Sequence, residues 1–113
     1  MRALRGRIHD VVVDIRRGSP DFGRAIAVEL DDRNRNALWV PPGFAHGFSV
    51  LSESAEVEYK CTALWAQDCE RTLLWNDPVL GIDWQVENPI LSAKDAVGLP
   101  LAALEPLPVY SAP

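Results

Sequence analysis

The stretch that decides the fold is LWVPPGFAHGFSVLSESAEVEYKCT, which runs from Leu38 to Thr62. A Pro-Pro-Gly turn separates its short apolar start from a run of alternating residues. Successive side chains of a β-strand point to opposite faces. At that period one face carries three apolar residues and a histidine, namely Phe44, His46, Phe48 and Val50.

A second alternating run follows, in which Val57, Tyr59 and Cys61 share a face. If the apolar faces of both runs line one interior, His46 and Tyr59 project into the same apolar cavity. Two polar groups that can transfer protons are costly in such a cavity unless they are partnered or used. The sequence therefore predicts that any chemistry takes place there.

Turn residues recur at short intervals along the chain, and no long helical period is present. The pattern predicts short strands at Ile8–Ile15, Arg24–Leu30, Ala37–Val40, Phe44–Leu51, Ala55–Leu64 and Arg71–Trp75. Many short strands between Gly, Pro and Asn-Asp turns are typical of an all-β sandwich or barrel. We expect one β domain over residues 1–100 and a Pro-rich tail, docked or partly loose, over residues 101–113.

Composition narrows the classes of function. The chain has 113 residues, 48% of them hydrophobic, which is enough for a single small core. A net charge of −5 argues against a surface for nucleic acid or for anionic membranes. No apolar run approaches the roughly 18 residues of a spanning helix, and the first residues do not resemble a signal peptide. We expect a cytoplasmic protein with Cys61 and Cys69 reduced, although a disulfide between them stays open.

Several motifs, in the same order and at the same spacing, resemble the dTDP-4-dehydrorhamnose 3,5-epimerases. They are GRIHDVVVDIRRGSPDFG (6–23), LWVPPGFAHGF (38–48), EYK (58–60), ERTLLWNDPVLGIDW (70–84) and PILSAKDA (89–96). The resemblance implies a cupin-type antiparallel β jelly roll that lacks the family's N-terminal region. That region carries an RGLHYQ-like segment with the base histidine and a QGKLV-like segment with an active-site lysine. Neither segment is among the 113 residues.

The resemblance also implies the chemistry. Protons at C3 and C5 of the sugar lie next to the C4 ketone, so a base can remove each one to give an enolate. By position, Tyr59 matches the general acid that returns a proton on the opposite face. Asp95, in the LSAKD motif, matches the aspartate that orients the base histidine. From the residues alone, Tyr59 could be a strand tyrosine at a rim, and Asp95 could belong to the cap of a helix that starts at Ser92.

His46 ends a PxGxxH pattern that also resembles the second cupin motif, in which the histidine binds a metal. A metal site needs further ligands, and His9 is the one other histidine. We therefore expect neither a metal nor a cofactor. The family resemblance makes His46 a substrate-binding residue near the sugar or pyrophosphate. The alternative is a core histidine with a satisfied hydrogen bond.

Trp65 stands six residues after Tyr59, where the family usually has tyrosines. Its ring could stack on a sugar or thymine ring and bind substrate, or it could pack at a sheet edge. Arg71 is expected to be a solvated surface cation.

Three hypotheses on function follow. The first is an epimerase of deoxysugar (rhamnose) biosynthesis that acts on a dTDP-4-keto-6-deoxyhexose and is impaired by the missing histidine and lysine. The second is a non-catalytic cupin module that binds a sugar nucleotide or pairs with a complete subunit. The third is a truncated gene product. An unpaired sheet edge invites association, so we expect a homodimer, and neither a nucleic acid nor a membrane as partner.

Overall fold

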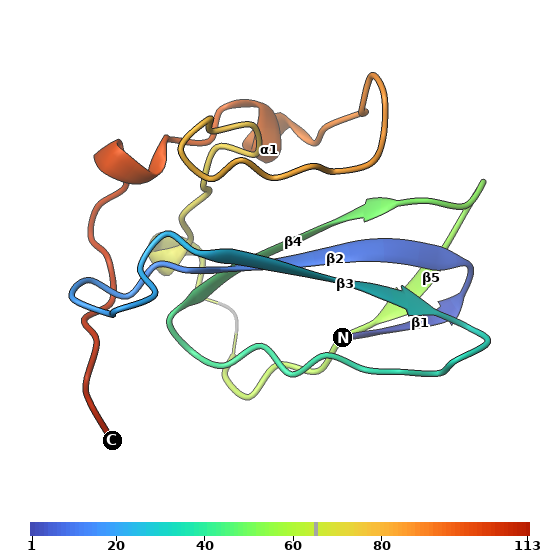
Figure 1. Cartoon of the computed structure of the whole chain (residues 1–113), viewed down its shortest axis with the longest axis horizontal. Helices are drawn as coiled ribbons and strands as arrows, with labels where there is room; N and C mark the ends of the chain where they lie inside the picture. Colours follow the sequence, from blue (N-terminus) through green and yellow to red (C-terminus); the bar gives the residue numbers. More distant parts are fainter. Residues whose placement is uncertain (65) are drawn as a thin grey trace.

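Two antiparallel sheets form the first half of the molecule (Figure 1). The computed structural model describes residues 1–64 and 66–113, apart from the side chain of Gln67. The smaller sheet pairs β1 (Arg2–Arg5) with β5 (Glu56–Glu58). The larger sheet has the order β3 (Ala25–Asp31), β2 (Arg7–Asp14), β4 (Phe44–Val50).

Strand β2 is central because its sequence suits burial on both faces. Its run Val11–Val13 is buried throughout, as expected for a short, continuous apolar segment between two neighbours. In the register of the sheet, Val12 lies opposite Ile26 of β3 on one side and opposite His46 of β4 on the other. The predicted strands at Ile8–Ile15, Arg24–Leu30 and Phe44–Leu51 are confirmed to within a residue at each end.

Gly6 lets the chain pass from the small sheet to the large one. It has φ +80°, and a Cβ atom at this position would lie 2.4 Å from the carbonyl oxygen of Ser54. Only glycine tolerates both conditions. The crossing brings Ala3 of β1 against Ile8 and Leu30 of the larger sheet, and these three buried side chains form the hydrophobic core.

Other predicted strands are wrong or too long. Ala37–Val40 forms a single bridge, between Ala37 and Arg2, and Arg71–Trp75 forms a single parallel bridge, between Leu73 and Leu99. The strand expected at Ala55–Leu64 ends at Glu58, because β1 is short and offers partners for residues 56–58 only. Strand β1 itself was not predicted, since RALR has no strand pattern of its own.

Among the described residues, the second half of the chain contains three short helical segments and long connections. They are η1 (Gln67–Cys69), α1 (Ala93–Ala96) and η2 (Leu101–Ala103). The predicted cap of α1 is confirmed: Ser92 is the N-cap, and its hydroxyl accepts a hydrogen bond of 3.1 Å from the backbone N–H of Asp95.

The C-terminal segment is docked on the turn after β2. The N–H of Arg17 donates to the Pro108 carbonyl at 2.7 Å, and the N–H of Tyr110 donates to the Arg17 carbonyl at 2.9 Å. The guanidinium of Arg16 lies 4.6 Å from the Phe44 ring centre and 4.9 Å from that of Tyr110. Cation–π contacts of this kind help to hold the tail against the start of β4.

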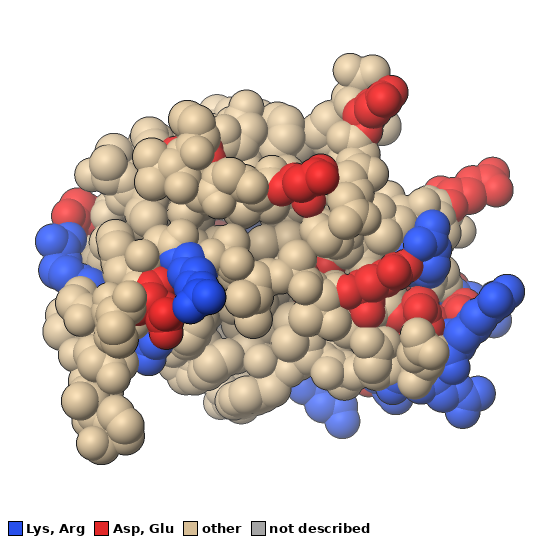
Figure 2. All heavy atoms as spheres, viewed as in Figure 1, with Lys and Arg blue, Asp and Glu red and all other residues tan. Residues whose placement is uncertain are grey.

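Charged side chains gather mainly at the end of the molecule where β1, β3 and β5 meet, at the right of Figure 2. Ion pairs there include Arg2–Glu58, Arg5–Glu56 and Arg7–Glu29. The middle of the face in view is largely uncharged. Both cysteines are exposed free thiols. In the part of the chain that the structure describes, no helix is long and apolar enough to cross a membrane.

Candidate functional site

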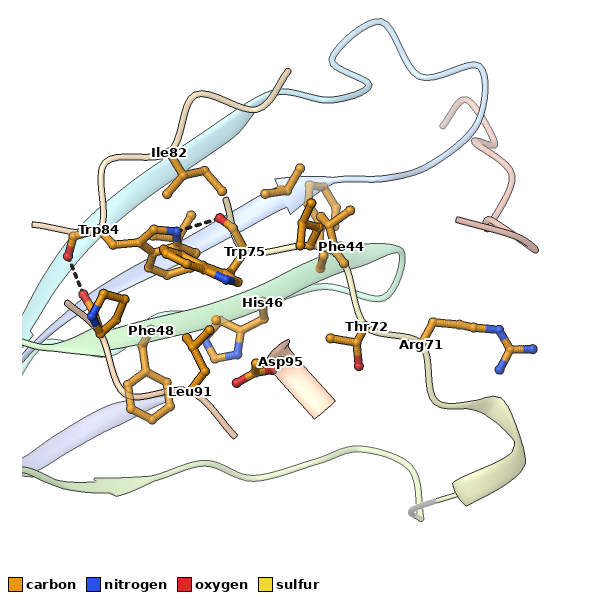
Figure 3. A pocket seen from close by; sticks show the side chains of 18 of the residues that line it. Phe44, His46, Phe48, Arg71, Thr72, Trp75, Ile82, Trp84, Leu91 and Asp95 are labelled. Carbon is orange, nitrogen blue, oxygen red and sulfur yellow. Dashed lines mark hydrogen bonds between the residues drawn. The ribbon is translucent and has the colours of Figure 1, made fainter. Parts of the chain in front are cut away.

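A pocket of about 1010 Å³ surrounds β4. Phe48, His46, Leu91 and Asp95 lie on one side of the strand, whereas Trp75, Ile82 and Trp84 lie on the other (Figure 3). The pocket extends round the edge of the sheet, because among the described strands β4 pairs with β2 alone. The walls come from the loops of the second half of the chain and from α1.

His46 is held on the pocket by a buried carboxylate. Its Nε2 lies 2.5 Å from Oδ1 of Asp10 on the neighbouring strand β2. The Asp10 side chain is 0% exposed, whereas 27% of the His46 side chain is exposed. The predicted face of β4 is therefore confirmed in its register, and its histidine is anchored rather than free.

That face is only half covered. Phe48 is 39% exposed and Val50 is 40% exposed, although both share the side of the sheet that carries the core residue Ile8. A face that combines apolar rings with a hydrogen-bonded imidazole suits a ligand with both apolar and polar parts.

Trp84 forms the opposite wall. Its indole N–H donates to the Trp75 carbonyl at 2.8 Å, and its own carbonyl accepts from the Ser49 hydroxyl at 2.7 Å. Gly47 makes room for the ring, since a Cβ atom there would lie 3.2 Å from the indole. These contacts hold the loop that contains residues 76–84 on the face of β4 opposite to His46.

Asp95 reaches the pocket from the short helix α1. The helix is tied to the preceding loop by Lys94, whose ammonium lies 3.1 Å from both carboxylate oxygens of Glu70. Within the described residues the Asp95 carboxylate has no hydrogen-bond partner, because the Ser92 cap uses only its backbone N–H. Asp95 and His46 line the same pocket.

Tyr59 does not line that pocket. The regular strand β5 ends one residue earlier, at Glu58, so the alternation of strand residues does not extend to Tyr59. Tyr59 is 65% exposed. The expectation that His46 and Tyr59 share a cavity is thus wrong for this structure. Trp65 lies outside the described residues. Arg71 is exposed, as expected of a surface cation. It also lines the pocket and donates hydrogen bonds to the backbone carbonyls of Asp68, Glu70 and Glu105.

Sequence reasoning missed two residues that shape the site, Asp10 and Trp84. A signal for Asp10 was present, because a carboxylate inside the apolar strand Ile8–Ile15 must be buried and hence partnered. Trp84 gave no such signal, since an aromatic residue in a loop can pack in many ways.

A second acidic residue of β2, Asp14, binds the arginine that contacts the Phe44 ring of the pocket. The Arg16 guanidinium beside Asp14 holds the pKa of that carboxyl well below its ordinary range, and the Ser19 hydroxyl and the Arg16 backbone N–H add to the shift. The arrangement positions Arg16 under Phe44, which lines the pocket. Within the described parts of the chain, no three His, Cys, Asp or Glu side chains are grouped so that they could hold a metal ion.

The sequence profile described as dTDP-4-dehydrorhamnose 3,5-epimerase matches residues 1–103. The chain belongs to this family. It is 49% identical over 109 residues to the dTDP-4-dehydrorhamnose 3,5-epimerase of Pseudomonas aeruginosa, and the match covers 96% of this chain and 60% of that protein. It is 48% identical to the Salmonella typhimurium enzyme of the same name, over 85% of this chain and 53% of that protein.

The solved structures agree on the fold. The Legionella pneumophila dTDP-6-deoxy-D-glucose-3,5-epimerase, in complex with dTDP-4-keto-L-rhamnose, is 42% identical with a TM-score of 0.94, over 98% of this chain and 61% of that one. A 3'-monoepimerase from Streptomyces bikiniensis, in complex with dTDP-quinovose, is 35% identical with a TM-score of 0.86, over 96% and 57% respectively. The predicted cupin-type, all-β fold is confirmed. The chain spans about 60% of the length of such relatives.

Proposed function

We propose that this chain binds a dTDP-linked 4-keto-6-deoxyhexose in the pocket around β4. We further propose that it acts in the 3,5-epimerisation of such sugars in the cytoplasm. The observation that carries the proposal is that His46, anchored by Asp10, and Asp95 line one pocket in a chain of this family. A relative with TM-score 0.94 is a complex with dTDP-4-keto-L-rhamnose.

The proposed roles follow the chemistry of an enolate. A base removes the proton next to the C4 ketone, a donor or cation stabilises the enolate oxygen, and an acid returns a proton on the other face. In this scheme Tyr59 is the acid, Asp95 orients the base, and His46 contacts the sugar or pyrophosphate. Trp65 stacks on a ring of the substrate.

Tyr59 must move to take part. It is 65% exposed and outside the pocket lining, just beyond the end of β5. A bound nucleotide sugar that covers the half-open face of β4 would give the phenol an apolar surface on which to pack. The proposal thus requires that the segment after Glu58 closes on the ligand.

Catalysis by the 113 residues themselves should be slow. Among the described residues His46 is the one histidine that lines the pocket, and in the proposed scheme it contacts the ligand rather than C3 or C5. Loss of a general base is worth roughly 10²–10⁴ in rate, and loss of an enolate-stabilising lysine would add to that.

Two measurements on the same protein test the proposal. Calorimetric titration with dTDP and with the dTDP-4-keto-6-deoxyhexose measures binding, and NMR of the sugar in deuterium oxide measures exchange at C3 and C5. The Pseudomonas aeruginosa relative is the positive control for exchange. We expect binding with slow exchange. No binding would refute the pocket assignment, and rapid exchange by the 113-residue chain would require that His46 act as the base.

The second candidate is a non-catalytic module that binds the same sugar nucleotide. It is favoured by the anchored His46, which is suited to hold a ligand even where no second histidine faces it among the described residues. The same pair of measurements separates the candidates: a module binds with no exchange above the rate of the free sugar, whereas an impaired epimerase exceeds that rate.

A further inference from the structure

We propose that Asp10 is a positioning residue that acts through His46 and decides which ring nitrogen faces the ligand. The identity of the ligand in this inference rests on the proposed function. The geometry of the Asp10–His46 pair does not depend on it.

Asp10 cannot touch a ligand directly. Its side chain is 0% exposed, it does not line the pocket, and it lies on the central strand β2, beside β4 in the same sheet. Its Oδ1 accepts from Nε2 of His46 at 2.5 Å. Any effect of Asp10 on binding must therefore pass through the imidazole ring.

The register of the sheet makes this contact rigid. Asp10 lies opposite Phe48 and Val12 lies opposite His46, so Asp10 is the diagonal neighbour of His46 on the same face. Diagonal neighbours on paired strands are within reach of long or aromatic side chains. Both residues sit inside regular strands, where the backbone allows little adjustment.

The second carboxylate oxygen argues against a purely structural role. Oδ2 of Asp10 is buried and has no hydrogen-bond partner within the described residues. A buried, half-satisfied carboxylate costs free energy that an apolar residue of similar size would not. The neighbouring carboxylate Asp14 shows the contrast, because both of its oxygens are satisfied by Arg16 and Ser19.

The pair sets the tautomer of the neutral ring. A carboxylate can only accept, so Nε2 must carry the hydrogen and Nδ1 is left as an acceptor. The described residues offer Nδ1 no hydrogen-bond partner, and the ring is 27% exposed at the pocket. Nδ1 is then the atom that accepts from a hydroxyl of the ligand.

The first test needs no ligand. In protein labelled with ¹⁵N-histidine, the Nε2–H proton of His46 should be protected from exchange and correlate with Nε2, while Nδ1 has the shift of an unprotonated nitrogen. Asp10→Leu should abolish the protected signal. Asp21→Asn, which removes an exposed carboxylate outside the pocket, should leave it intact, and His9 provides an internal reference in each spectrum.

An exposed, rapidly exchanging Nε2–H in the unmodified protein would overturn the proposal, and so would a protected signal that survives Asp10→Leu. The first of these outcomes does not depend on whether any variant folds. Asp10→Ala, which also removes the acceptor, supplies a second variant if Asp10→Leu does not fold.

The second test is a double-mutant cycle on the binding of the dTDP-4-keto-6-deoxyhexose, with Asp10→Leu, His46→Ala and the double variant. Loss of one hydrogen bond of ordinary strength should weaken binding about tenfold for each single variant. Because Asp10 acts only through His46, the double variant should bind no more weakly than His46→Ala. Additive losses would overturn the proposal. If the unmodified chain binds no sugar nucleotide, the proposed function fails, while the NMR test still decides the role of Asp10.

Discussion

Replacement of Asp14 by asparagine tests the contact that joins β2, β4 and the C-terminal segment. One oxygen of Asp14 accepts from the backbone N–H of Arg16 at 2.9 Å and from its Nε at 3.0 Å. The other accepts from Arg16 Nη2 at 2.7 Å and from the Ser19 hydroxyl at 2.6 Å. An asparagine has one acceptor oxygen and no charge, so it cannot keep this set of bonds.

The cost follows from the burial of the carboxylate, whose side chain is 3% exposed. Because asparagine keeps one acceptor oxygen, we take the net loss as that of a single hydrogen bond to a charged group, about 1.5–3 kcal/mol. For a chain of this length 1 kcal/mol corresponds to about 4 °C in Tm, so Asp14→Asn should lower Tm by roughly 6–12 °C at pH 7. Asp21→Asn is the matched control, because its pair with Arg24 is exposed on both sides and is worth little.

The effect should depend on pH in a defined direction. Arg16 lowers the pKa of Asp14 in the folded protein below its ordinary value of 3.8. A depressed folded-state pKa means that the stabilisation is fully present above the unfolded value and is lost as pH falls towards the folded one. Thermal unfolding followed by circular dichroism should therefore give a difference between the two proteins that narrows below about pH 4. An equal Tm at pH 7, or a difference that grows in acid, would refute this reasoning.

Three further outcomes are expected. Trp65→Ala should weaken binding of the nucleotide sugar by about 1–2 kcal/mol if the ring stacks, and an unchanged affinity in calorimetry would return Trp65 to a packing role. Gly98→Ala should cost about 1–3 kcal/mol, because a Cβ atom there would lie 2.8 Å from the Leu73 carbonyl oxygen; an unchanged Tm would show that the loop yields. Light scattering should give a dimer or higher assembly, since β4 has a free edge among the described strands, and a monomer at high concentration would contradict this.

The sequence by itself determined the local structure of this protein where one strong pattern acted alone. The apolar run within Ile8–Ile15 required a strand, the alternation from Phe44 to Val50 required a strand with His46 on its apolar face, and Ser92 marked the start of a helix. These features depend on residues a few positions apart, whose relation the backbone period fixes. The order and spacing of the motifs were also enough to identify the family.

Only the tertiary structure decided which distant segments meet. The contact between Asp10 and His46 joins residues 36 positions apart and depends on the register of β2 against β4, which no local pattern states. Strand β1 exists because β5 pairs with it, and Tyr59 lies beyond the regular strand because that pairing ends at Glu58. Periodicity fixes the face on which a side chain lies, whereas its neighbour across the sheet is set by the packing of the whole chain.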